Sequence, residues 1–336
     1  MEPFLLGTVI VAAGGFAFLN GFHDVSNSVA TAVRTRALTP TVAVLLAATF
    51  NLVGALLSTS LALFFTDLGV GLPSGTTGLG ILLAALGAAG VWGVFTWYRG
   101  KPSSSTHALL GGIIGAGGAS QLVRGPAMEG AAHALLLQIA LPLVLSPIIA
   151  FGLAYLTVFP ATWLLRHSSP AKVNRRSRMG QSVLAGAFAL GHGLQDGQRT
   201  MAVILLALVG SGYATGSSIP LWVQVFAAVL LATGSLFGGW RITHTLGNRL
   251  VSMDPLRGMT AQGVSSAMLF IGAIALHFPL SSTHTMTSAI VGAGANQRFA
   301  SVQRPRVASI LAVWLATAPA TALLGAIFLL AISPLL

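Results

Sequence analysis

The stretches PSSSTHALLGGIIGAGGA at residues 102–119 and PLSSTHTMTSAIVGAGA at residues 279–295 decide the fold. Each is too short to cross a bilayer, which takes about 20 apolar residues, and too rich in hydroxyl groups to face lipid. Interrupted backbone at membrane depth is tolerated only where protein or water covers it. We therefore expect each stretch to form a re-entrant helical hairpin, and their similarity indicates an internal duplication of the chain.

A second pair of similar motifs supports the duplication. GFHDVSNSVA contains Asp24 and GLQDGQRTMA contains Asp196, and these two residues are 172 positions apart. His107 and His284, at matching places in the hairpin stretches, are 177 positions apart. Basic residues divide evenly between the two sides of the expected spans, as two halves of opposite orientation would give. The steady offsets predict three regions, namely a first transmembrane repeat at 1–165, a basic linker at 166–179 and a second transmembrane repeat at 180–336.

Composition places the chain in a membrane. Of its 336 residues 54% are hydrophobic and only 7% are charged, whereas soluble domains carry about 25% charged residues. The net charge of +11 comes mostly from basic residues between apolar runs, where topology and anionic lipid account for them. This composition, without any cysteine, excludes a soluble enzyme, a disulfide scaffold and a nucleic-acid partner, and predicts a multi-pass membrane protein. The long apolar runs fall near residues 4–20, 40–65, 77–98, 131–163, 180–212, 219–239, 263–278 and 306–334.

Two acidic residues lie inside apolar stretches, at matching places in the two halves. A carboxylate at membrane depth costs at least ~2.5 kcal/mol, so Asp24 and Asp196 should face a cavity and have partners. We interpret both as ligands of a coupling cation or proton, with His23 beside Asp24 as a possible proton relay. The alternative is a packing or helix-capping role, in which Asp24 follows a helix break at Gly21.

Arg199 is the one basic residue inside an expected span. It follows Asp196 by three positions, so both side chains lie on one helical face. An internal ion pair would neutralise the helix, and a guanidinium can also hold an oxyanion through two parallel hydrogen bonds. The two roles are compatible, because an ion pair can open when an anion arrives.

The hairpin stretches offer a set of hydroxyl groups in each half. Hydroxyls and backbone amides at the N-termini of broken helices are good ligands for a tetrahedral oxyanion. Ser and Thr also cap helices, but each hairpin carries more hydroxyls than a cap needs. The candidate anion ligands of this kind are Ser104, Ser105, Thr106, Ser281, Ser282 and Thr283.

Sequence signatures of enzymes are missing. The chain has no Walker A lysine motif, no HExxH, no CxxC and no nucleophile elbow. An intramembrane serine hydrolase would have to use Ser104 or Ser105 with His107. Two equivalent polar constellations suit alternating access better than a single catalytic site, so we expect a transporter that needs no cofactor and no resident metal.

At the level of whole motifs the chain resembles the inorganic phosphate transporter (PiT) family. The resemblance rests on GFHDVSNSVATAVRTRALTP at residues 21–40, GHGLQDGQRTM at residues 191–201 and the paired hairpin stretches. It implies an all-α fold of two inverted-topology repeats with broken helices and two re-entrant helical hairpins. It also implies a homodimer in the bacterial cell membrane that carries phosphate together with a cation.

In the first motif, the resemblance places Asp24 and Asn27 at the family's cation and phosphate site. His23 stands where many members have Asn, which is similar to the bacterial branch. That branch moves phosphate with protons, often as a neutral metal–phosphate complex.

In the second motif, Gln195 stands where the family has Asn and Arg199 where it has Lys, whereas Asp196 and Gln198 match the family. The two departures weaken the case for sodium coordination and leave anion contact open. The resemblance implies that Gln195, Gln198 and Arg199 contact the substrate.

The function we expect is import of inorganic phosphate, free or complexed with Mg²⁺ or another divalent ion, by symport with a cation, most simply H⁺. A sodium-coupled phosphate symporter and a sulfate permease of the same fold stay open as alternatives. We expect Asp24→Asn and Asp196→Asn each to abolish uptake without preventing insertion into the membrane.

Overall fold

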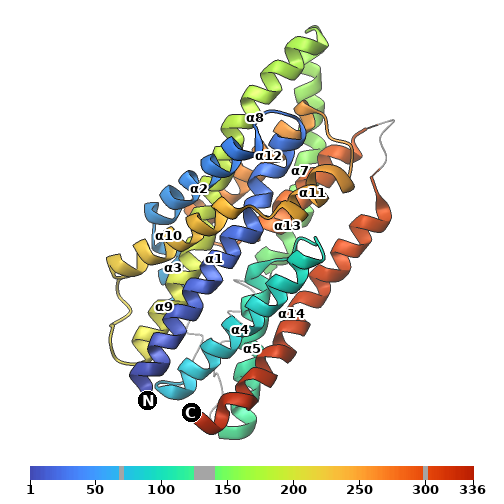
Figure 1. Cartoon of the computed structure of the whole chain (residues 1–336). Coiled ribbons are helices and arrows are strands. Elements are labelled where there is room, and N and C mark those ends of the chain that lie inside the picture. The colour runs from blue at the N-terminus through green and yellow to red at the C-terminus, as the bar shows by residue number, and fades with distance from the viewer. Residues whose placement is uncertain (68–71, 125–140, 298–301) are drawn as a thin grey trace.

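A computed structural model describes residues 1–67, 72–124, 141–297 and 302–336, and every regular element in these ranges is a helix (Figure 1). Within these ranges six helices are long and apolar enough to cross a membrane, or seven if α10 and the bent segment after it form one span. The beginning of the apolar run expected at 131–163 lies outside the described residues. The six are α1 (Glu2–Arg34), α2 (Pro40–Leu57), α4 (Thr76–Tyr98), α7 (Leu141–Leu165), α12 (Pro255–Phe270) with its π-helical extension η4 (Ile271–Leu276), and α14 (Arg304–Ile332).

The remaining elements are shorter or more polar. Several begin at recognisable signals; for example, Asp254 accepts a hydrogen bond from the backbone of Arg257 at the start of α12, where Pro255 occupies the first helical position. They are α3 (Ser60–Asp67), α5 (Ser105–Arg124), α8 (Pro170–His192), η2 (Gly193–Gly197), α9 (Gln198–Gly210), α10 (Leu221–Phe237), α11 (Trp240–His244), η3 (Thr245–Arg249), α13 (Ser282–Ala295) and η5 (Ser333–Leu335).

Two helical hairpins are present, but their arms differ from the expectation. The stretch 102–119 supplies only a tip and the beginning of the second arm, α5, and the preceding helix α4 is the first arm. The stretch 279–295 likewise supplies a tip and α13, which follow α12 and η4. In each stretch the Ser and Thr residues start one continuous helix, so there is no turn inside it. Figure 1 shows α4 and α5 in the part of the molecule that holds both termini, and α12 and α13 toward the opposite end.

The predicted helix breaks near the two aspartates are wrong. α1 runs without interruption through Asp24, and Gly21 serves close packing, because a Cβ there would lie 2.0 Å from the Leu231 carbonyl oxygen of α10. In the second half, α8 continues through the π-helical η2 into α9, so Asp196 lies on a widened helical turn. A π-turn keeps the chain helical while it shifts the direction of the side chains, and such turns are frequent at functional sites.

The packing of the two halves is reciprocal. α1 crosses α10, where a Cβ on Gly234 would meet the Phe18 carbonyl at 2.0 Å, and η2 crosses α2, where a Cβ on Gly193 would meet the Asn51 carbonyl at 2.3 Å. α5 packs on α14, and α13 packs on α7. The inverted repeats and the division at 1–165, 166–179 and 180–336 stay predictions, which this exchange of partners supports. Most of the basic linker is helical, because α8 already begins at Pro170.

Candidate functional site

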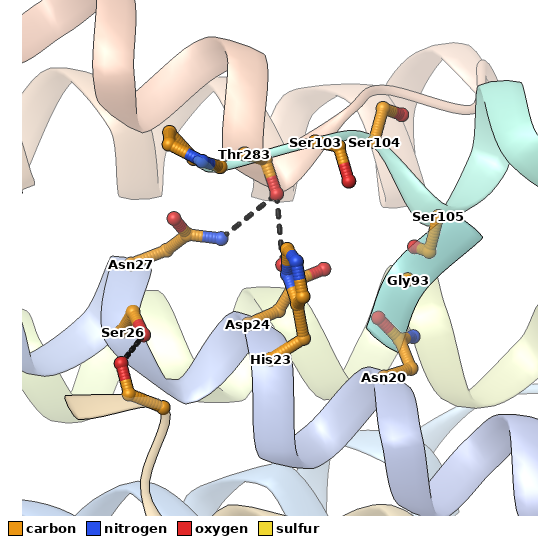
Figure 2. A network of polar contacts seen from close by, with 12 residues as sticks. Asn20, His23, Asp24, Ser26, Asn27, Gly93, Ser103, Ser104, Ser105 and Thr283 are labelled. Atoms are coloured by element: carbon orange, nitrogen blue, oxygen red, sulfur yellow. Dashed lines mark hydrogen bonds and ion pairs between the residues drawn. The ribbon is translucent and has the colours of Figure 1, made fainter. Parts of the chain in front are cut away.

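Asp24 lies in the middle of a buried polar cluster on α1 and is 1% exposed. Its Oδ1 accepts a hydrogen bond from Thr283 Oγ1 at 2.9 Å and lies 3.0 Å from His23 Nδ1 (Figure 2). Its Oδ2 has no hydrogen-bond partner among the described residues. One oxygen of this buried carboxylate is therefore available to a ligand.

Asp196, its counterpart on η2, is surrounded by donors. Asn20 Nδ2 of α1 donates to its Oδ2 at 3.2 Å and Ser282 Oγ donates to the same oxygen at 3.4 Å. His192 Nε2 lies 2.9 Å from this oxygen, and Arg199 forms an ion pair with Oδ1. Groups from α1, α8, α9 and α13 thus meet at one carboxylate on the π-turn, which compensates its burial.

Arg199 connects both hairpins to this cluster. Its Nη1 donates to Ser105 Oγ at 3.1 Å, at the start of α5. Its Nη2 donates to Asp196 and, at 3.1 Å, to the Leu280 carbonyl oxygen in the loop before α13. The prediction of an internal ion pair is confirmed, and the guanidinium also lies where the tips of the two hairpins approach each other.

The protonation of His192 can be deduced from its neighbours. Ser235 Oγ donates its hydrogen to a backbone carbonyl of α10, so it accepts from Asn51 Nδ2 at 2.8 Å. This fixes the Asn51 amide with Oδ1 toward His192 Nδ1, at 2.9 Å, and assigns a hydrogen to Nδ1. In a neutral ring the lone pair of Nε2 then faces Asp196 Oδ2 at 2.9 Å and Asp24 Oδ2 at 3.8 Å.

Three lone pairs that converge in a buried place repel one another unless a positive charge lies between them. One ligand atom each from Asp24, His192 and Asp196 lie within 4.8 Å of one another. Either a proton on Nε2 or a cation among the three atoms satisfies this arrangement. Nitrogen and carboxylate oxygen together form a donor set that suits divalent transition metals, so the residues fit such an ion.

The hydroxyl groups of the hairpins divide into two roles. Ser104 Oγ accepts from the backbone of His107 at 3.3 Å and Ser281 Oγ from that of His284 at 3.2 Å, so these two serines cap their helices. Ser105, Ser282 and Thr283 instead contact the buried charges. Thr106 is buried, and its hydroxyl has no partner in the described part of the chain. Among the described residues the serine hydrolase is not assembled, because Ser104 meets the backbone of His107 rather than its ring and Ser105 accepts from Arg199.

The side chains of Gln195 and Gln198 form hydrogen bonds with backbone amides of other segments. The Gln195 Oε1 accepts from the Leu280 amide at 3.2 Å, which fixes the loop of the second hairpin. The Gln198 Oε1 accepts from the amides of Leu61 and Ala62 at 2.8 and 3.1 Å, which fixes the beginning of α3. Their predicted contact with substrate would require these bonds to open.

Cross-half contacts follow the offset of 172 residues. Asn27 Nδ2 donates to Thr283 Oγ1 at 3.0 Å, and its counterpart Arg199 donates to Ser105, so each half contacts the hairpin of the other half. Asn20, which donates to Asp196, and His192, whose Nε2 lies 2.9 Å from the same carboxylate, are also 172 apart. Asn20 was not considered as a site residue in the sequence reasoning, although the offset could have found it.

A pocket adjoins the cluster between α1, α4 and the tip of the first hairpin. Asn20, His23, Ser103 and Ser105 line it with polar groups, and Gly93 of α4 is also part of its lining (Figure 2). Aromatic and aliphatic side chains form the rest of its wall. His23 thus lies between the pocket and Asp24, as a proton relay would.

Comparison with known proteins assigns a family to this chain. Residues 20–325 match the Phosphate transporter family. A protein of Rhizobium meliloti (strain 1021) named "Probable low-affinity inorganic phosphate transporter" is 40% identical over 332 residues, which cover 97% of this chain and 95% of the relative. A protein of the same name from Bacillus subtilis (strain 168) is 38% identical over 325 residues, which cover 95% of this chain and 94% of the relative.

A solved structure named "The sodium-dependent phosphate transporter" has the same fold. The TM-score is 0.84 at 19% sequence identity, and the match covers 99% of this chain and 100% of that one. At this identity the similarity speaks for the fold alone. On the family match and the curated relatives, this chain belongs to the phosphate transporter family and is a multi-pass transporter of inorganic phosphate in the bacterial cell membrane, not an enzyme.

Proposed function

We propose that this chain imports inorganic phosphate by symport with a cation and that the coupling ion is H⁺. The observation that carries the proposal is the buried cluster of Asp24, His192, Asp196 and Arg199, which contacts both hairpins. In this cluster, carboxylates whose negative charge is not fully compensated lie beside a guanidinium that can bind an anion. Such a pair of adjacent sites is what coupled transport of a cation and an anion requires.

The anion site in this proposal lies between the first turns of α5 and α13. Two helix N-termini, each with partial positive charge, face the region of Arg199. Ser105, Ser282 and Thr283 add hydroxyls that already bind charged groups, and Thr106 adds one without a partner among the described residues. Asn27, through its contact with Thr283, holds the second hairpin against α1.

The coupling site consists of Asp24 and Asp196, completed by His192. Two carboxylates and one guanidinium leave one net negative charge when His192 is neutral. A proton or another cation neutralises this net negative charge. The neutral cluster then no longer repels an incoming anion. Binding of the cation thus favours binding of phosphate, which is the physical basis of symport. His23 passes protons between the pocket and Asp24.

The same donors allow a divalent ion to accompany phosphate. An ion at Asp24, His192 and Asp196 would lie beside Arg199 and the hairpin hydroxyls, so metal and phosphate could be carried as one complex.

Association as a homodimer is also part of the proposal, and the mass of the purified detergent complex measures it.

Uptake of radiolabelled phosphate into proteoliposomes tests the proposal. We expect uptake to follow an imposed proton gradient, to be unaffected by a sodium gradient and to resist competition by excess sulfate. Parallel vesicles with and without Mg²⁺ report whether the metal accompanies phosphate. Dependence on sodium would overturn proton coupling, and transport of sulfate in place of phosphate would overturn the substrate.

A further inference from the structure

Two histidines that the phosphate and cation sites do not use meet between the hairpins. His107 and His284 occupy equivalent positions in the two halves, each in the first turn of its helix, just after the capping Ser104 or Ser281. Their ring centroids are 4.7 Å apart, and the ring planes are inclined by 32°. The rings thus join the start of α5 directly to the start of α13.

A third ring extends this stack to the last long helix. The indole of Trp314 on α14 lies 3.9 Å from the His284 ring, centroid to centroid, at an interplanar angle of 27°. The same indole donates its N–H to the Pro102 carbonyl oxygen at 3.0 Å, in the loop of the first hairpin. The stack therefore ties both hairpin tips and α14 together in the present conformation.

Each imidazole has a nitrogen that lacks a hydrogen-bond partner within the described ranges, Nδ1 in His107 and Nε2 in His284. His284 is 4% exposed, so water does not readily compensate this nitrogen. Leaving a buried polar atom without a partner is costly, and a phenyl ring would stack equally well without that cost. The presence of such a nitrogen in both halves indicates a use that stacking alone does not explain.

The charges around the pair decide what a proton would do. Arg199 on α9 binds the neighbouring Ser105, and Asp24 on α1 binds the neighbouring Thr283. Asp196 on η2 pairs with Arg199, and His192, at the end of α8, contacts Asp196. α4 and α7, which pack on α5 and α13, contain no charged residue, and α14 contributes Trp314. α12 carries only the Asp254–Arg257 pair, at its start.

Neutral imidazoles stack favourably, but a second charge in this buried place is repelled. A proton on both rings would bring two like charges close together beside Arg199 and two positive helix ends. Alternating access requires the two halves to move relative to each other, so the contact between the hairpin tips has to open at some step.

We propose that the His107–His284 stack is a latch between the two hairpins, closed while the rings are neutral and opened by their protonation during the transport cycle. The proposal rests on proton-coupled phosphate transport as set out above. His107 and His284 are in this sense positioning residues, which set the distance between the hairpin tips and do not bind phosphate themselves.

Cross-linking tests the latch, and the chain suits it because it contains no cysteine. The double variant His107→Cys with His284→Cys is reconstituted and treated with an oxidant or a short bis-thiol reagent. We expect at least a tenfold loss of phosphate exchange on cross-linking and its recovery with reductant, whereas each single cysteine variant is unaffected by the oxidant. Unchanged exchange in the cross-linked protein would overturn the latch.

Aromatic replacement tests the role of the proton, and decides the question if the cysteine pair is inactive. His107→Phe and His284→Phe keep the stack but cannot take up a proton, so we expect slower exchange and loss of its acceleration at acidic pH. Wild-type rates and pH profile in both Phe variants would show that the rings only pack. Absence of phosphate uptake by the unaltered protein would instead contradict the proposed function, so the two failures are distinguishable.

Discussion

The two aspartates at equivalent positions have different surroundings. Asp196, on the π-turn η2, binds a permanent cation, Arg199, and further donors from both halves. Asp24, on the regular helix α1, has a hydroxyl and an imidazole on one oxygen, and its other oxygen has no hydrogen-bond partner among the described residues, with His192 Nε2 3.8 Å away. The comparison teaches that two equivalent positions can differ in their partners. Asp196 already pairs with an internal cation, whereas Asp24 is the open copy, with one oxygen free of hydrogen bonds for the mobile cation of the proposed coupling site.

Asp24→Asn is the change with the largest expected effect on transport. The amide preserves the shape of the side chain but removes the charge that a coupling ion needs, so phosphate uptake should fall to background. Because Asn can still accept from Thr283, the variant should insert and keep its thermal stability in detergent. Asp254→Asn, at a partly exposed pair outside the cluster, is the control. Substantial uptake by Asp24→Asn would contradict its role as the open copy.

Arg199→Met should damage stability as well as transport. Removing one partner of a buried ion pair leaves an uncompensated charge, which costs about 3–5 kcal/mol in the free energy of unfolding. Arg257→Met breaks a pair of the same spacing that is 19% and 38% exposed and should cost ~1 kcal/mol or less. Thermal denaturation of the two purified variants measures the difference. Equal loss in both would mean that Asp196 does not depend on Arg199.

Gly21→Ala and Gly193→Ala examine whether the two halves pack alike. Each added methyl group would meet a backbone carbonyl oxygen, at 2.0 and 2.3 Å, so we expect a similar loss of about 1–3 kcal/mol in both variants. Gly15→Ala, on the same helix as Gly21, has open space around the new Cβ and should not destabilise the protein. A large loss in one half only would show that the helix crossings are not equivalent.

The smallest effect is expected at the two helix caps. Ser104→Ala and Ser281→Ala each remove one side-chain acceptor for a backbone amide at a hairpin tip, which costs ~1 kcal/mol. If the hydroxyls also contact phosphate, as the sequence predicts, both variants should show a raised KM for uptake. An unchanged KM with lowered stability would leave capping as their role.

Much of the fold could be predicted from the repeated motifs, because the offsets between Asp24 and Asp196 and between His107 and His284 locate equivalent elements. The continuity of the helices could not be predicted. Glycine beside a functional residue resembles a helix break in sequence, but Gly21 and Gly193 allow two backbones to touch, and only the partner helix reveals this.

The central residues of the candidate site could be predicted from the sequence, because they are charged residues in apolar surroundings. The residues that contact them could not be predicted. Gln195 and Gln198 resemble ligands in sequence, yet their side-chain oxygens accept hydrogen bonds from backbone amides of segments distant in the chain. The orientation and protonation of His192 depend on the fixed amide of Asn51, which lies on a helix far away in sequence. Contacts of this kind depend on which helices cross, and local sequence patterns do not encode the crossings.

The exchange of packing partners between the halves has a consequence for biosynthesis. α5 ends at Arg124, whereas α14, on which it packs, begins only at Arg304. At ordinary rates of translation the first hairpin therefore waits roughly ten to forty seconds for its partner helix. During this time its small-residue surface and hydroxyl groups need cover from the insertion machinery or from neighbouring lipid. Variants that slow the late part of synthesis should consequently lower the yield of this protein even when they leave its finished structure unchanged.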